Sequence, residues 1–135
     1  MALKRSSLFA LRALPAVLEA ALEVRRLTGA AIPIHQLPAL LRQRATPLPA
    51  RLRKPAELAE LADRLAPFLP PRRLGPCLRK SLILLNLWAR CGLDPRLHLG
   101  ARKGGPDGAR PDFHAWVSAG ERIHGHGEHR ELWSG

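Results

Sequence analysis

Residues 76–91 read PCLRKSLILLNLWARC, and this stretch decides the fold. Pro76 suits the first turn of a helix, and Gly92 suits the position just past its end. The apolar run from Leu82 to Ala89 is too short to cross a bilayer, and Asn86 interrupts it. The stretch is therefore predicted to be a helix of a folded domain.

Cys77 lies in the first turn of this predicted helix. Backbone N–H groups without acceptors and the positive end of the helix dipole gather there. Both favour the thiolate, which is the reactive form of cysteine, and Arg79 and Lys80 add positive charge nearby. The same N–H groups could contribute to an oxyanion hole. Cys77 is thus a candidate nucleophile, and a small buried apolar residue is the alternative interpretation.

The second cysteine, Cys91, lies at the other end of the same predicted helix. The two are 14 residues apart (91 − 77). A rise of about 1.5 Å per residue separates them by roughly 21 Å, beyond the reach of a disulfide. Cys91, among apolar neighbours, is predicted to be structural.

Past the helix, the spacing of apolar residues changes from helical to alternating. Residues 96–102 (RLHLGAR) and 113–117 (FHAWV) predict strands, and residues 121–125 predict a strand that returns after a tight turn. Residues 103–111 hold three Gly and two Pro and predict a loop. The second half of the chain is therefore expected to form a small antiparallel sheet.

His114 is the candidate base. It shares one face of its strand with Trp116, whereas the apolar Phe113, Ala115 and Val117 share the other and should face the core. A cysteine nucleophile needs an imidazole that accepts its proton and later protonates the leaving amine. A histidine that is merely exposed on a strand is the alternative.

A third residue usually orients the imidazole, and here the sequence leaves it open. The turn near Gly120 places residues 125–127 roughly opposite His114. His126 is therefore the tentative third member, and Glu128 is a weaker alternative. Asp112, which comes just before residues 113–117, ranks lower. A Cys–His dyad remains possible on this pattern.

The first half of the chain is predicted to be helical, over residues 7–28, 34–44 and 55–68. Pro15 should kink or split the first of these helices. A length of 135 residues favours one domain, with a helical subregion over 1–70 and a catalytic core over 71–135. The expected fold is α+β, with a helical N-terminal half followed by a cysteine-bearing helix packed on a small antiparallel sheet.

The net charge of +11 comes from 22 Lys and Arg against 11 Asp and Glu, spread along the chain. Nucleic acid is an unlikely partner on this reading, because three Phe, three Trp and no Tyr offer few stacking surfaces. A basic surface would attract an acidic peptide.

Alternate strand residues His124 and His126 could share a metal, but no second ligand pair stands at a standard spacing, so no metal or cofactor is expected. Without a convincing secretory signal, a cytoplasmic protein is the default.

Three motifs in order resemble the B proteins of lasso-peptide biosynthesis, which are transglutaminase-like leader peptidases of the microcin-processing type. Residues 76–82 (PCLRKSL) resemble that family's C-L-x-x-S-L helix, Gly100-Ala101-Arg102 resembles its G-V-R strand, and residues 114–117 match its H-A-W-V strand. The resemblance covers about residues 60–135. The family's glutamate after H-A-W-V is Ser118 here, and the hairpin is one residue shorter, so its acidic third residue does not carry over.

This resemblance implies a papain-like or transglutaminase-like fold and a stand-alone cysteine peptidase. Cys77 would be the nucleophile and His114 the base. The substrate would be a ribosomally synthesised lasso-peptide precursor, whose leader is removed. The implied partners are that precursor peptide, a separate leader-recognition protein and an ATP-dependent lasso cyclase, with no membrane involved.

Two other classes of function stay open from the sequence. The first is a different acyl-transfer enzyme on the same fold, such as a transglutaminase or an amidase. The second is a non-enzymatic basic protein that binds nucleic acid or a peptide, and its binding would depend steeply on salt but not on Cys77.

Overall fold

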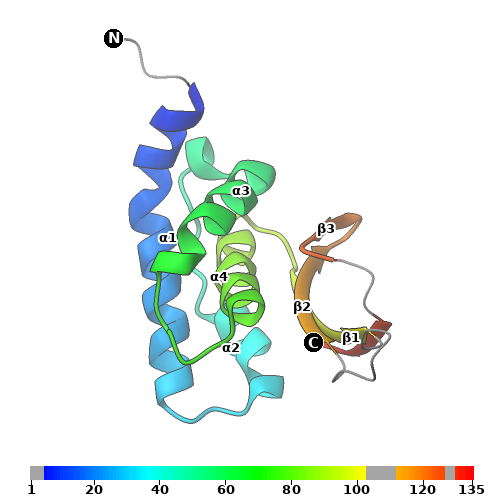
Figure 1. Cartoon of the computed structure of the whole chain (residues 1–135). Helices are drawn as coiled ribbons and strands as arrows, with labels where there is room; N and C mark the ends of the chain where they lie inside the picture. The colour runs from blue at the N-terminus through cyan, green and yellow to red at the C-terminus, as the bar shows by residue number, and fades with distance from the viewer. Residues whose placement is uncertain (1–4, 103–111, 127–129) are drawn as a thin grey trace.

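The computed structural model describes residues 5–102, 112–126 and 130–135 (Figure 1). Its helices come first along the chain, joined by three short 3₁₀ turns. The α-helices are α1 (Arg5–Gly29), α2 (Leu37–Gln43), α3 (Pro55–Leu65) and α4 (Pro76–Arg90), and the 3₁₀ turns are η1 (Ile34–Gln36), η2 (Ala50–Leu52) and η3 (Ala66–Phe68).

Four antiparallel strands follow, in the spatial order β3-β2-β1-β4. They are β1 (Arg96–Arg102), β2 (Asp112–Ala119), β3 (Arg122–His124) and β4 (Arg130–Ser134). The predicted α+β class, with helices first and a small antiparallel sheet second, is confirmed. The strand predicted over residues 96–102 has the bounds of β1, whereas β4 was not predicted.

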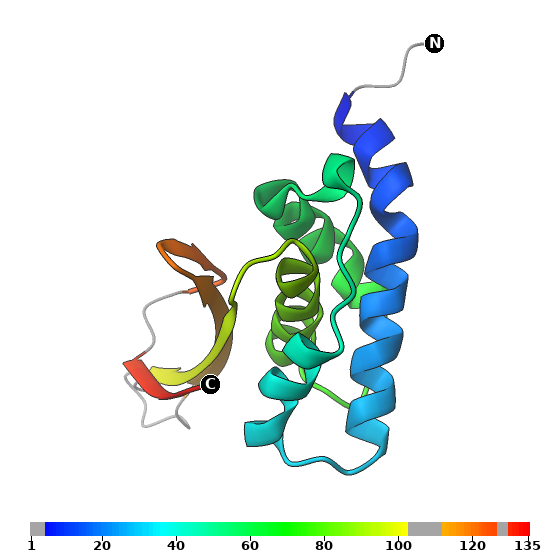
Figure 2. The same cartoon turned by 180° about the vertical axis from the view of Figure 1, so that it is seen from behind.

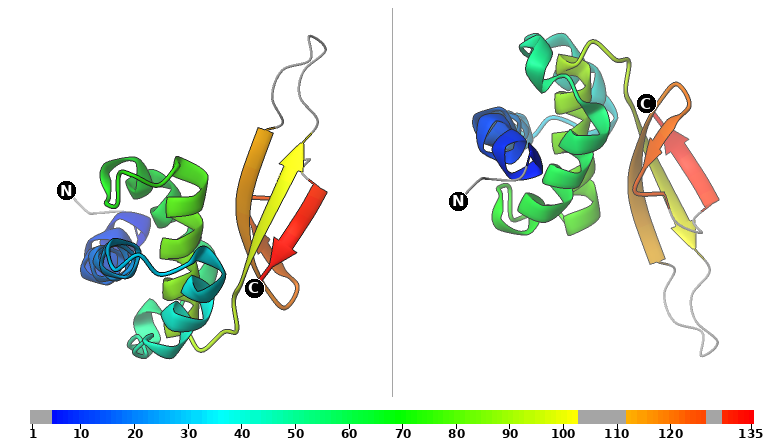
Figure 3. Two further views of the ribbon diagram at one scale, coloured as in Figure 1. Left: turned by 90° about the horizontal axis from the view of Figure 1, so that it is seen from below. Right: turned by 90° about the horizontal axis from the view of Figure 1, so that it is seen from above.

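Helix α4 lies between the other helices and the sheet. Figures 1 and 2 show α1 on one side of α4 and the sheet on the opposite side, and both views of Figure 3 show the same layering. Residues 81–88 of α4 are all buried, because neighbours cover the helix on every side. Two polar groups in this run have partners: Asn86 donates to the Leu41 carbonyl at 3.3 Å, and the Trp88 indole donates to the Pro55 carbonyl at 3.0 Å.

Helix α1 differs from the prediction at Pro15. It continues through Pro15 as one helix, because Pro15 is exposed and water can solvate the carbonyl group that its missing N–H leaves without a donor. The face that α1 buries consists mostly of small side chains. The buried residues are Ala13, Ala16, Val17, Ala20, Ala21, Val24 and Leu27, whereas Leu8, Leu11, Leu18 and Leu22 are exposed. Small side chains allow α1 to approach α4 closely.

The sheet buries one face against α4. Leu97 and Val117 are fully buried there, and Ala115 is nearly so, as the alternating pattern predicts. Phe113 was predicted to face the core with Ala115, but it is 69% exposed. It stands near the start of β2 and lines the rim of a pocket instead.

Both cysteines are free, which agrees with the prediction that Cys77 and Cys91 form no disulfide. Among the residues that the structure describes, no helix has the length and apolar character needed to cross a membrane.

Candidate functional site

Cys77 occupies the second position of α4, where the backbone leaves hydrogen-bond donors available. Gly75 is the N-cap, and Pro76 takes the first helical position. The first hydrogen bond of the helix runs from the Arg79 N–H to the Gly75 carbonyl, at 3.0 Å. The N–H groups of Cys77 and Leu78 precede it and have no acceptor within the helix. Glycine has no side chain with which to cap them, so these donors can serve a ligand beside the half-buried thiol.

The two basic residues that follow Cys77 have different surroundings. The Lys80 ammonium pairs with Asp63 at 3.3 Å. Arg79 is 7% exposed, and its Nε has no hydrogen-bond partner within the part of the chain described. The cationic end of α4 therefore combines one paired charge at the surface with one buried guanidinium.

His114 lies on β2, and its Nε2 is hydrogen-bonded to the carbonyl oxygen of Gly125. A carbonyl oxygen only accepts, so Nε2 carries the hydrogen in this bond. In the neutral ring the lone pair then belongs to Nδ1. The bond with Gly125 thus selects the tautomer in which Nδ1 is the basic nitrogen.

An ion-pair cluster around Asp63 holds the hairpin that carries Gly125. Asp63, on α3, binds His124 of β3 at 2.9 Å and Lys80 of α4 at 3.3 Å. Gly125 follows His124 directly. The cluster therefore ties this carbonyl to the same helix that carries Cys77, although partly exposed pairs of this kind contribute only modestly to stability.

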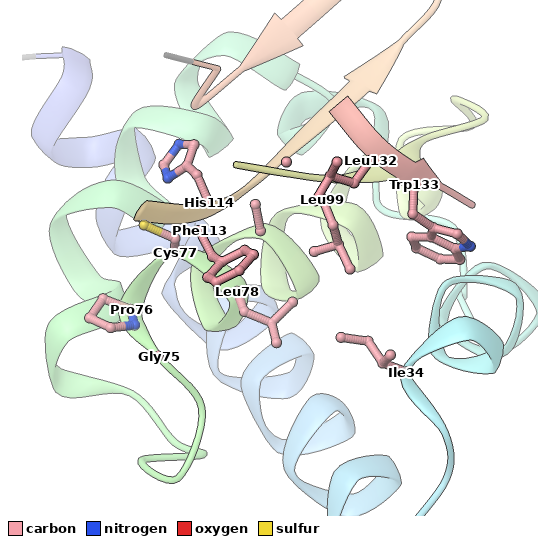
Figure 4. A pocket seen from close by; sticks show the side chains of 12 residues that line it. Ile34, Gly75, Pro76, Cys77, Leu78, Leu99, Phe113, His114, Leu132 and Trp133 are labelled. Atoms are coloured by element: carbon pink, nitrogen blue, oxygen red, sulfur yellow. The ribbon is translucent and has the colours of Figure 1, made fainter. Parts of the chain in front are cut away.

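One pocket brings Cys77 and His114 together. Both line a cavity of about 570 Å³, between the start of α4, the sheet and η1. Figure 4 shows the sulfur of Cys77 and the ring of His114 at the same end of this pocket. A carbonyl group bound in the pocket would lie near a thiol, an imidazole and backbone N–H donors. Acyl transfer uses these three kinds of group as nucleophile, base and oxyanion hole.

The residues considered for the third member of the catalytic site differ in how the structure places them. His126 packs against Trp116, with ring centroids 4.5 Å apart. Its role as a third member stays a prediction. Glu128 lies outside the described residues, and so does the side chain of Asp112. The sequence did not single out Gly125, because a backbone carbonyl that accepts from a histidine leaves no trace in residue type.

Trp116 lies between two histidines on the outer face of the sheet. The His98 ring stacks on it at 5.5 Å between centroids, and the His114 ring at 6.2 Å. His98 is hydrogen-bonded in turn through Nδ1 to Glu131 and through Nε2 to the Ser118 hydroxyl, the latter at 2.5 Å. These bonds join β1, β2 and β4 and fix the indole beside the candidate base.

Gly100 leaves the space that this indole needs. A Cβ atom at position 100 would lie 2.5 Å from the Arg130 carbonyl oxygen and 2.6 Å from the Trp116 ring. Neither neighbour is flexible. We expect Gly100→Ala to lower the free energy of unfolding by about 1–3 kcal/mol, as overpacking does. Urea denaturation measures the change.

Gly29→Ala is the matched control, because a Cβ there meets nothing within 4 Å. It should leave the free energy of unfolding nearly unchanged. Equal stability of the two variants would contradict the packing described at Gly100.

A metal site was also considered for the C-terminal histidines, of which His129 lies outside the described residues. Among the described residues there is no group of three or more His, Cys, Asp or Glu side chains that could hold one. His124, one of the two possible ligands named from the sequence, is bonded to Asp63.

Cys91 has a different environment from Cys77. It is the C-cap of α4 and is half-buried, and burial raises the pKa of its thiol, an effect that Arg53, Arg90 and Arg122 oppose. A raised pKa keeps the thiol protonated to higher pH, so Cys91 should be a poor nucleophile near neutrality.

Comparison with known families places the chain in a superfamily. The sequence profile of the Transglutaminase-like superfamily matches residues 14–133 of the 135. Comparisons with curated proteins and with solved structures gave no significant match. The profile spans helices and sheet alike, and so covers both Cys77 and His114. The chain belongs to the transglutaminase-like superfamily.

Proposed function

We propose that this chain is a cysteine endopeptidase that removes the leader peptide from a ribosomally synthesised lasso-peptide precursor. The observation that carries the enzymatic part is the shared pocket of Cys77 and His114. Membership of a superfamily with a cysteine-protease or acyl-transferase fold supports it. The finer assignment to lasso precursors rests on the three motifs around Cys77, Gly100 and His114.

The chemistry follows from the placement of each group. Nδ1 of His114 takes the thiol proton as the Cys77 sulfur attacks the scissile carbonyl carbon. The N–H groups of Cys77 and Leu78 stabilise the negative charge that develops on the carbonyl oxygen. When the C–N bond breaks, the imidazolium returns the proton to the leaving amine. Water then hydrolyses the thioester with His114 as base and restores the thiol.

The leader-recognition protein and the ATP-dependent cyclase remain the proposed partners, and a cytoplasmic location remains the expectation. His126 remains the tentative third member of the site, beside the Gly125 carbonyl that is bonded to His114.

Mass spectrometry of the precursor tests this function. We expect incubation with the chain and the leader-recognition protein to yield two fragments whose masses add up to the precursor plus one water. A joined product lighter by ammonia would instead identify a transglutaminase. An unchanged precursor that binds in a steeply salt-dependent manner, whether or not Cys77 is present, would identify a binding protein.

Replacement of Gly125 tests how the base is held. Gly125 has φ +87°, and a Cβ there would meet its nearest neighbour at 3.7 Å, so Gly125→Ala meets strain in the backbone rather than a clash. That strain is worth about 1–2 kcal/mol and should displace the carbonyl from His114. We expect cleavage to slow by about tenfold.

Gly120→Ala is the control for Gly125→Ala. Gly120 also has positive φ, +61°, and has open space around its Cβ position, but it has no bond to His114. Its replacement should cost similar stability and leave the cleavage rate unchanged. If both variants slow cleavage equally, the bond between Gly125 and His114 has no role in the reaction.

A further inference from the structure

Among the residues that the structure describes, the lining of the pocket beside Cys77 is apolar apart from the two candidate catalytic side chains. These described lining residues include no Asp, Glu, Lys or Arg. Six large apolar side chains form most of the wall, and they come from η1, α4 and three strands: Ile34, Leu78, Leu99, Phe113, Leu132 and Trp133. Figure 4 shows Phe113 and Leu78 beside the end that holds Cys77 and His114, and the other four farther along the cavity.

The rim of this pocket leaves apolar surface open to water. Phe113 is 69% exposed, Leu132 64% and Ile34 37%. These residues lie on three separate segments, yet all three line the same cavity. Exposed apolar side chains that converge on a cavity are typical of a binding site.

The floor of the pocket is formed by side chains that are less exposed than those at its rim. Leu78, Leu99 and Trp133 are partly buried and pack against the hydrophobic core. The cavity, at about 570 Å³, falls within the range of sites that enclose small ligands. It therefore has room for a large side chain together with the backbone on which that side chain stands.

We infer that this pocket binds a large aliphatic or aromatic side chain of the substrate, close to the bond that Cys77 attacks. The inference rests on the proposed function and names its substrate class. A charged side chain in the pocket would lose its hydration and find no opposite charge among the lining residues that are described. A Leu, Ile, Met or Phe side chain would gain by leaving water.

Precursor variants test the preference directly. Once the cleavage site is mapped, each residue that flanks it is replaced in turn by Leu, Ala or Asp, and kcat/KM is measured. At one flanking position we expect Leu to exceed Ala by roughly tenfold and Asp by roughly a hundredfold or more. Equal cleavage of the Leu and Asp variants at every flanking position would overturn the inference.

Matched variants of the chain locate the preference in this pocket. Phe113→Ala and Leu132→Ala remove rim side chains, whereas Phe68→Ala and Leu11→Ala remove side chains of similar exposure, 74% and 59%, elsewhere. We expect the rim variants to raise KM for the Leu substrate with little change in kcat, and the controls to leave both unchanged. If the rim variants behave like the controls, the pocket does not bind the substrate.

A binding measurement separates this inference from the proposed function. Fluorescence anisotropy of labelled Leu- and Asp-containing precursor peptides with Cys77→Ala protein needs no turnover. If no precursor is cut but the Leu peptide binds at least tenfold more tightly, and Phe113→Ala removes that difference, the peptidase proposal fails and the pocket inference stands. Equal binding of the two peptides overturns the inference even if cleavage is observed.

Discussion

Cys77→Ala should abolish release of the leader while the protein stays folded. The sulfur forms the covalent intermediate, and no other group among the described lining residues can replace it as a nucleophile of comparable strength. We expect cleavage to fall by at least about a thousandfold. Mass spectrometry of the precursor measures the loss, and circular dichroism shows whether the fold survives.

Cys91→Ala is the control for this variant. Cys91 is the same residue type at the opposite end of the same helix, and it does not line the pocket. Its replacement should leave the cleavage rate unchanged. Normal processing by Cys77→Ala protein, or equal losses in the two variants, would contradict the proposed mechanism.

His114→Ala should slow cleavage by about 10² to 10⁴-fold, the usual contribution of a general base. Without the imidazole, the thiol must lose its proton to the solution. Cleavage rates measure the loss, and urea denaturation shows whether the variant keeps the stability of the unmodified protein. An unchanged cleavage rate would contradict the role of His114 as base.

Two other histidine variants accompany that measurement. His35→Ala removes an exposed imidazole on η1 that does not line the pocket, and it should have no effect. His126→Ala should cost less than His114→Ala, because the Gly125 carbonyl still holds Nε2 of His114. A loss as large as that of His114→Ala would instead make His126 an essential member of the site.

The central helix and its cysteine were predictable because local rules decide them. Pro76 at the start of α4 and an uninterrupted apolar run fix where the helix begins and how deeply it is buried. The position of Cys77 at the helix tip follows directly. The alternation of residues 96–102 and 113–117 likewise predicted β1 and most of β2.

Features that depend on tertiary packing were harder to predict. The sequence predicted a helix over residues 7–28, but the choice of its alanine-rich face for burial depends on the packing against α4. Phe113 has the alternation of a core residue, yet the helices do not cover it. The partner of His114 is a main-chain oxygen, and the position of that oxygen depends on the turn at Gly125.

The central claim is that Cys77 and His114 act on each other, and alkylation by iodoacetamide tests it most directly without any substrate. Protein that carries Cys91→Ala has Cys77 as its only cysteine. We expect rapid labelling of Cys77 in this protein, and much slower labelling when His114→Ala is added, because the imidazole no longer takes the proton. Equally slow labelling with and without His114 would contradict the account.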